Sequence, residues 1–169
     1  MSTVSECIEP RYRKERKVDV FRLYIHHTRI NMKIDSIQNG IVLDHITAGN
    51  AMKIYYDLGL DKLDCSVALI QRVKSKKMGT KDIIKIDKEE YDLDLDVIGY
   101  IDPTVTVSII KNGETIEKKR VDLPEKLINI KRCKNPRCIT AIEPGIDHIF
   151  KLTDSEKRIY RCIYCEADK

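Results

Sequence analysis

Apolar and polar residues alternate in short runs between residues 32 and 121, and these runs predict strands. The runs occupy 32–37 (MKIDSI), 40–46 (GIVLDHI), 65–73, 82–88, 104–110 and 114–121. Asn39-Gly40 and Asn112-Gly113 are turn dipeptides, and the second one joins two predicted strands as in a tight hairpin. Residues 48–60 instead have apolar side chains at near-helical spacing, with Gly59 as a suitable helix end.

Residues 90–101 fit two interpretations. Leu93, Leu95 and Val97 alternate as in a strand, whereas the length and flanks of the segment suit a helix. Strands interrupted by two helix-like segments predict an α+β fold with a mostly antiparallel sheet, in the ferredoxin-like arrangement.

The composition changes at Leu123-Pro124-Glu125, from aliphatic to rich in Cys, Arg and Lys. We therefore expect one domain over residues 32–125 and a small β domain over 126–169. Residues 1–31 show no clean period and are interpreted as a leader of uncertain order, with Met32 as a candidate translation start. The small domain has 44 residues, near the size at which a hydrophobic core alone gives only marginal stability. We therefore expect disulfides or a metal ion to stabilise it.

The cysteines of the small domain can provide this stabilisation. They form the pairs Cys133-x4-Cys138 and Cys162-x2-Cys165, with 23 residues between the pairs. Short loops can direct four sulfurs toward one point, which suits tetrahedral Zn²⁺. Two disulfides, an iron site of rubredoxin type and a redox-active pair are the alternatives, and a reducing cytosol disfavours the disulfides. A closed four-thiolate site has no open coordination position, so the metal would be structural.

Composition and charge exclude several classes of protein. No apolar run reaches the roughly 18–20 residues of a membrane helix. The N-terminus lacks the apolar region of a secretory signal, so we expect a cytoplasmic protein without membrane contact. The net charge is +4, but residues 1–31 have seven basic and four acidic side chains, against 24 and 23 in the rest. The charge of the folded body therefore does not favour nucleic-acid binding.

The sequence offers no convincing catalytic site. It has neither a GxGxxG motif nor a P-loop, and an isolated Asp44-His45 pair is more often a satisfied turn than a catalytic dyad. Cations on the predicted strands are more informative. Lys81 and Lys85 share one face at period two, and Lys118, Lys119 and Arg120 lie on the return strand of the hairpin. These lysines could hold a polyphosphate, or they could belong to an ordinary solvated sheet face.

Four sequence features occur together in a highly specific order. They are Asp44-His45-Ile46, the segment 78–86 (MGTKDIIKI), Leu123-Pro124-Glu125, and the Cys133/Cys138 loop followed by 160–166 (YRCIYCE). From about Met32 to Glu166 the chain resembles the regulatory chain of aspartate carbamoyltransferase. It departs from the best-known members at Ser108, Gly113 and Thr115 around the hairpin and at Arg137 in the cysteine loop.

The resemblance implies a non-catalytic allosteric subunit in pyrimidine biosynthesis, with catalysis in a partner chain. Its N-terminal domain would bind CTP and ATP in competition. Its C-terminal domain would hold one structural Zn²⁺ and dock onto the catalytic chains, and the regulatory chains would form homodimers. A zinc-ribbon nucleic-acid-binding protein is the alternative, because Lys131, Arg132, Lys134 and Arg137 flank the cysteine loops.

The resemblance also implies a role for individual residues. Positions around the base and ribose match Ile34, Asp35, Ile37 and Lys85. Asp44 and His45 match the ribose and phosphate side, Lys81 and Lys118 match lysines at the phosphates, and Ile83 and Ile110 match the pocket lining. The metal ligands would be Cys133, Cys138, Cys162 and Cys165.

Overall fold

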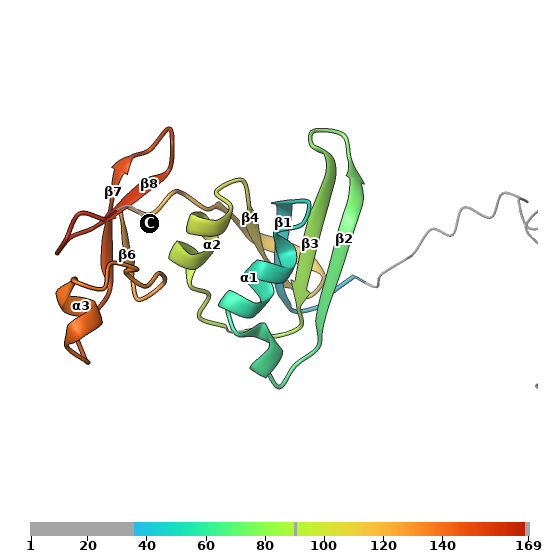
Figure 1. Ribbon diagram of the computed structural model, residues 1–169. Coiled ribbons are helices and arrows are strands. Elements are labelled where there is room, and N and C mark those ends of the chain that lie inside the picture. Colours follow the sequence, from blue (N-terminus) through green and yellow to red (C-terminus); the bar gives the residue numbers. More distant parts are fainter. Residues whose placement is uncertain (1–35, 90, 168–169) are drawn as a thin grey trace, which may run out of the picture. The chain divides into compact units, whose positions relative to one another are not determined.

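The computed structural model describes residues 36–89 and 91–167 (Figure 1). Most of this chain is a five-stranded sheet with two α-helices. Its elements are β1 (Gly40–Thr47), α1 (Ala51–Asp57), the 3-10 turn η2 (Leu60–Lys62), β2 (Val67–Ser75), β3 (Gly79–Ile86), α2 (Leu95–Ile101), β4 (Thr106–Lys111) and β5 (Glu114–Arg120). The leader predicted over residues 1–31 lies outside the described residues.

The strands of this sheet lie in the order β2-β3-β1-β4-β5, and each neighbouring pair is antiparallel. The chain order βαββαβ with this strand order is the ferredoxin-like arrangement, extended by β5 at one edge. Figure 1 shows α1 and α2 together on one face of the sheet. The predicted α+β fold with a mostly antiparallel sheet is therefore confirmed.

The hydrophobic core lies between that face and the two helices. Side chains at alternate strand positions point into it, as the period-two pattern requires. Its fully or nearly fully buried members are Ile41, Leu43, Ile46, Ala51, Ile54, Leu60, Ile84, Ile86, Ile98, Val105, Val107 and Val121.

Both helices are shorter than the sequence pattern predicts. The helix expected over 48–60 covers only Ala51–Asp57, because Gly59 takes a left-handed φ of 66° and begins η2. The ambiguous segment 90–101 becomes helical at Leu95, where the Asp94 carboxylate accepts hydrogen bonds from the Asp96 and Val97 N–H groups at 3.0 and 3.1 Å. The helical interpretation is therefore right from Leu95 onward, and residues 91–94 belong to no strand.

Strand boundaries differ from the predicted ones by up to three residues, and the strand expected over 65–73 spans Val67–Ser75. The strand expected over 82–88 begins earlier, at Gly79, and the one expected over 104–110 begins at Thr106. Of the strand predicted over 32–37, residues 32–35 lie outside the described residues, and Ser36 and Ile37 belong to no strand.

The cysteine-rich segment forms a separate small sheet. Strands β6 (Lys126–Ile128), β7 (Ile149–Asp154) and β8 (Ile159–Cys162) pair antiparallel in that order, and the short helix α3 (Ile139–Ile142) follows the first cysteine loop. Among the described residues, its fully buried core has three large side chains, from Leu127, Phe150 and Tyr160, packed with Cys133, Cys138 and Cys162, and partly buried side chains such as Ile130 and Leu152 surround it. So small a core agrees with the expectation that the cysteines stabilise this part of the chain.

Helix α2 contacts the small sheet. The rings of Tyr100 in α2 and Tyr160 in β8 pack edge to face, with centroids 5.5 Å apart. The Tyr160 hydroxyl donates a hydrogen bond to the Pro124 carbonyl at 2.6 Å. Gly99 allows α2 to approach this connecting segment, because a Cβ atom there would lie 2.1 Å from the Asp122 carbonyl oxygen.

Candidate functional site

The face of the five-stranded sheet that points away from α1 and α2, here called the outer face, has a row of polar side chains. Lys85 in β3 is paired with Val42 in β1, Val42 with Ser108 in β4, and Ser108 with Lys118 in β5. The next row of the same four strands, with Leu43, Ile84 and Val107, is buried under the helices. Since side chains alternate along a strand, Lys85, Ser108 and Lys118 lie on the outer face.

A β-bulge in β1 brings Asp44 and His45 to the same face. Leu43 is paired with Ile84 and Ile46 with Asp82, so Asp44 and His45 together oppose the single residue Ile83. His45 has a φ of 61°, a conformation that costs a non-glycine residue about 1 kcal/mol. Consecutive residues of a regular strand would point to opposite faces.

Asp44 and Lys81 form a close ion pair beside the bulge. The Lys81 Nζ atom lies 2.6 and 2.8 Å from the two carboxylate oxygens, and the His45 N–H donates to Asp44 Oδ1 at 2.7 Å. Burial alone would raise the pKa of Asp44. The hydrogen bonds from Lys81 and His45, together with their charges, outweigh it and lower this pKa below its usual value, so Asp44 is ionised at neutral pH.

His45 has a buried Nδ1 atom without a hydrogen-bond partner among the described residues. Although Nδ1 lies 3.2 Å from Asp44 Oδ2, the geometry does not satisfy a hydrogen bond. An unpaired buried polar atom is uncommon in a folded protein and suits a site that a ligand completes.

A polar cavity of about 270 Å³ lies between the bulge and the edge strand β5. Its lining combines cationic side chains with two threonine hydroxyls, a chemistry suited to phosphate oxygens. The lining residues are His45, Lys77, Pro103, Thr104, Thr106, Lys118 and Arg120.

Of these residues, the sequence assigns His45 and Lys118 to the nucleotide site, and it indicates Arg120 only as one of the cations on the return strand. Arg120 was predictable, because it lies two positions after Lys118 on the same strand and is paired with Thr106. Lys77 and Thr104 lie in loops, where strand periodicity gives no signal.

The remaining predicted nucleotide residues lie as follows. Ile83, Lys85 and Ile110 are half-buried on the outer face, and Lys118 is exposed. Ile37 is half-buried just before β1, and Ile34 and Asp35 lie outside the described residues. With strands about 4.8 Å apart, Lys85 and Lys118 are separated by about 14 Å across four strands, so a ligand that contacts both must be extended.

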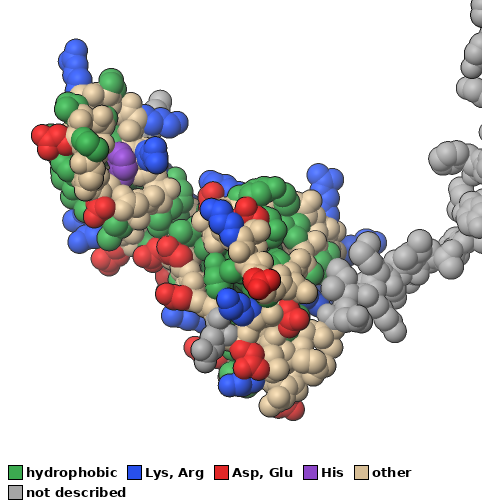
Figure 2. All heavy atoms as spheres, turned by 90° about the horizontal axis from the view of Figure 1, so that it is seen from below, with side chains coloured by type: hydrophobic (Ala, Val, Ile, Leu, Met, Phe, Trp, Pro, Cys, Tyr) green, Lys and Arg blue, Asp and Glu red, His purple; other side chains and the backbone are tan. Residues whose placement is uncertain are grey.

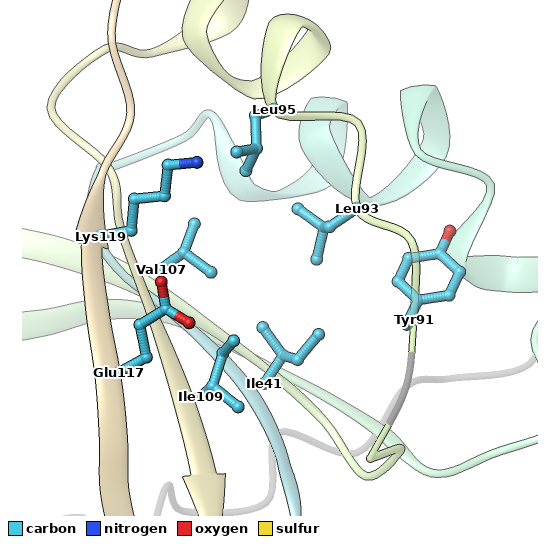
Figure 3. A pocket seen from close by; sticks show the side chains of 8 residues that line it. All are labelled: Ile41, Tyr91, Leu93, Leu95, Val107, Ile109, Glu117 and Lys119. Carbon is cyan, nitrogen blue, oxygen red and sulfur yellow. The ribbon is translucent and has the colours of Figure 1, made fainter.

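A second cavity, of about 220 Å³, lies on the helix-covered face (Figure 3). Its floor and walls are apolar, and Glu117 and Lys119 of β5 point over it. None of the predicted site residues lines it. Lys119 is paired with buried Val107, so Lys118 and Lys119, although adjacent, serve opposite faces of the sheet.

The four cysteines of the small sheet converge on one point. Their sulfur atoms all lie within 4.8 Å of one another, with 3.5 Å between Cys133 and Cys165 and 3.8 Å between Cys138 and Cys162. Zn–S bonds of 2.3 Å in a tetrahedron place sulfurs about 3.8 Å apart, so the set fits such an ion. None of the cysteines among the described residues forms a disulfide.

Neighbouring groups act differently on these thiols. The Thr140 hydroxyl, which donates to Cys138 Sγ at 3.2 Å, lowers the pKa of Cys138 to about 7, whereas burial raises that of Cys133 to about 12. A bound dication favours the thiolate form of all its ligands. The His148 Nδ1 atom accepts a hydrogen bond from the Cys133 N–H at 3.3 Å and so supports the first cysteine loop from outside the ligand set.

Apolar side chains are exposed around the cysteine loops. Ile142 at the end of α3 is 64% exposed, and Ile163 and Tyr164, between the last two cysteines, are 48% and 42% exposed. On the face shown in Figure 2, Lys and Arg side chains are interspersed with Asp and Glu. Three large apolar side chains exposed on so small a part of the chain favour a protein partner over a polyanion.

Two family models match the chain. One, described as "Aspartate carbamoyltransferase regulatory chain, allosteric domain", covers residues 32–122, and the other, described as the metal binding domain of the same chain, covers residues 125–168. No helix among residues 36–89 and 91–167 is long and apolar enough to cross a membrane.

Curated relatives agree with the family models. The regulatory chain of aspartate carbamoyltransferase from Clostridium tetani is 50% identical over 135 residues, which are 80% of this chain and 94% of that one. The chain of the same name from Bifidobacterium longum is 44% identical over 137 residues, 81% of this chain and 98% of that one. The Clostridium botulinum chain is 49% identical over 135 residues, 80% and 92% respectively.

Proposed function

This chain belongs to the family of aspartate carbamoyltransferase regulatory chains, and we propose that it binds CTP and ATP on the outer face of its five-stranded sheet and transmits their effect to the catalytic chains. It has an allosteric domain and a metal-binding domain, and the family name implies a catalytic-chain partner. In this proposal the chain itself is not catalytic.

One observation supports the nucleotide site above others. The bulge at His45 brings Asp44 and His45 onto the face that also has Lys81, Lys85 and Lys118. A polar cavity with cationic and hydroxyl side chains opens beside them. In our proposal the triphosphate lies toward Lys118 and His45, and the base and ribose lie toward Lys85, along the about 14 Å that separates the two lysines.

Calorimetric titration of the full chain tests this function. We expect CTP and ATP each to bind one site and to compete with each other, with affinities above those of the free triphosphate. A DNA duplex should bind weakly at physiological salt. Salt-sensitive DNA binding without nucleotide binding would instead support the alternative zinc-ribbon nucleic-acid-binding protein.

For the metal we propose one structural Zn²⁺, held by Cys133, Cys138, Cys162 and Cys165. The spacing of the sulfurs and the absence of disulfides among the described cysteines support this choice. Four sulfur ligands favour zinc or iron over harder cations, and colourless protein would exclude iron. All four ligand positions are occupied by protein in this proposal, so the ion organises the loops and takes no part in chemistry.

Transmission to a partner requires a path from the nucleotide face to a docking surface. Helix α2 is suited to this role because Tyr100 packs on Tyr160, two residues before Cys162. In our proposal a regulatory-chain homodimer presents two such small sheets, and the exposed side chains of Ile142, Ile163 and Tyr164 dock onto catalytic chains.

Replacing Ile142 by Asp should weaken assembly with the separately purified catalytic chain of the same organism by about tenfold or more, because a buried apolar contact would have to accommodate a charge. Sedimentation of the mixed chains measures this. Ile116→Asp is the matched control, since Ile116 is equally exposed, at 61%, but lies on β5. Equal effects of the two substitutions would place the docking surface elsewhere.

A further inference from the structure

The carboxylate of Asp102, at the end of α2, is almost completely buried, with 2% of the residue exposed. It accepts four hydrogen bonds. One oxygen accepts from the Thr47 N–H at 2.7 Å and from Asn50 Nδ2 at 3.3 Å, and the other accepts from the N–H and hydroxyl of Thr104 at 3.1 and 2.6 Å. Burial works against ionisation, but these donors outweigh it and lower the pKa of Asp102, so the group is an anion at neutral pH.

These donors tie together two segments that are distant in sequence. Thr47 is the last residue of β1, Asn50 follows it just before α1, and Thr104 lies between α2 and β4. The Thr104 hydroxyl oxygen is also 3.1 Å from the carbonyl oxygen of His45. Its single proton is shared between that carbonyl and the closer Asp102 carboxylate. Asp102 therefore acts on the bulge from both sides, through Thr47 after it and through Thr104 against His45.

The bulge needs such support, because His45 has a positive φ that its side chain disfavours. Its N–H is held by Asp44 at 2.7 Å and its carbonyl lies against Thr104. Farther along, the Gly49 N–H is held by buried Asp82 at 2.8 Å. Of these supports, Asp102 alone connects the bulge with helix α2.

We propose that Asp102 is a positioning residue for the nucleotide site: without touching the ligand, it fixes the bulge that turns Asp44 and His45 toward the outer face, and it joins that bulge to α2. The identity of the ligand in this proposal rests on the proposed function, but the effect on the bulge does not. A merely structural cap of α2 would affect the helix and leave His45 unchanged.

Asp102→Asn tests the proposal, because the amide keeps the shape but brings N–H donors against two of the four donors that surround the carboxylate. We expect hydrogen exchange of the His45 amide, followed by NMR in the full zinc-loaded chain without nucleotide, to become about tenfold faster. CTP and ATP affinities, measured by calorimetry, should each fall by about tenfold. Zinc content should stay at one per chain.

Two further variants make the test decisive. Thr104→Val removes only the hydroxyl between Asp102 and His45 and should also speed exchange at His45, whereas Thr104→Ser should restore the wild-type rate. Asp94→Asn weakens the cap at the other end of α2, where the carboxylate accepts from Asp96 and Val97, and should leave His45 unchanged.

The outcomes separate the two proposals. Unchanged exchange at His45 in both Asp102→Asn and Thr104→Val would overturn the positioning role, as would an equal effect of Asp94→Asn. If Asp102→Asn does not fold, Thr104→Val and Thr104→Ser decide the question. Failure of the wild-type chain to bind either nucleotide would refute the proposed function, whereas the exchange measurements would still decide whether Asp102 positions the bulge.

Discussion

A chain with Cys138 replaced by Ser should lose the proposed zinc and unfold its small sheet while the five-stranded sheet stays folded. Three thiolates bind the ion far less tightly than four, and the apparent binding free energy of a structural zinc site, about 10–16 kcal/mol, is also folding free energy. Among the described residues of the small sheet, Leu127, Phe150 and Tyr160 are the large side chains that are fully buried, too few to replace that contribution.

Zinc per chain and NMR spectra measure this effect together. We expect about one zinc per wild-type chain after release by a mercurial, and loss of dispersed signals from residues 126–167 in the variant, with signals from 40–120 retained. Cys65→Ser is the matched control, because Cys65 is half-buried outside the cluster and should leave both measurements unchanged. A variant that keeps one zinc and all its dispersed signals would contradict the proposed site.

Lys118→Ala should weaken CTP and ATP binding by comparable factors of about ten to one hundred. A charge-assisted hydrogen bond to phosphate contributes about 1.5–3 kcal/mol, and both nucleotides present the same triphosphate. Calorimetry on the full chain measures both affinities. By linkage, the catalytic rate of the assembled complex should lose its dependence on nucleotide but keep its nucleotide-free value.

Lys119→Ala is the matched control for Lys118→Ala. It removes the same charge from the next residue of the same strand, but its side chain lies over the apolar cavity of the opposite face. We expect nearly wild-type binding. Lys85→Ala, on the base and ribose side, should instead affect CTP and ATP unequally. Equal losses in Lys118→Ala and Lys119→Ala would mean that general electrostatic attraction, and not the proposed contact, determines binding.

The sequence allowed the sheet and the cysteine cluster to be predicted because both depend on local patterns. Alternation identified the strands, and loop spacing indicated that Cys133, Cys138, Cys162 and Cys165 would converge. Helix ends were less predictable, since the end of α1 depends on the left-handed φ of Gly59 and the start of α2 on the Asp94 side chain.

The bulge at His45 could not be predicted from alternation, which places Asp44 and His45 on opposite faces. Its conformation depends on Thr104 and on the register with β3, contacts between residues far apart in sequence. The buried carboxylates of Asp82 and Asp102 were missed for the same reason. An acidic residue within a strand or at a helix end usually faces water, and only the folded chain brings backbone donors to it.

The length of the Asn112-Gly113 turn, together with the β-bulge between Thr115 and Glu117, determines which charges of β5 point to the outer face. At present Lys118 and Arg120 are paired with Ser108 and Thr106, and Glu117 and Lys119 point the other way. Gaining or losing one residue in the turn would rotate the side chains of β5 to the other face of the sheet. The outer face would then present Glu117 and Lys119 in place of Lys118 and Arg120, with no side chain replaced. Turns tolerate such insertions and deletions better than strands do. If the proposed nucleotide site is right, a single-codon change in this hairpin would therefore alter the charges at the triphosphate without touching any residue of the site.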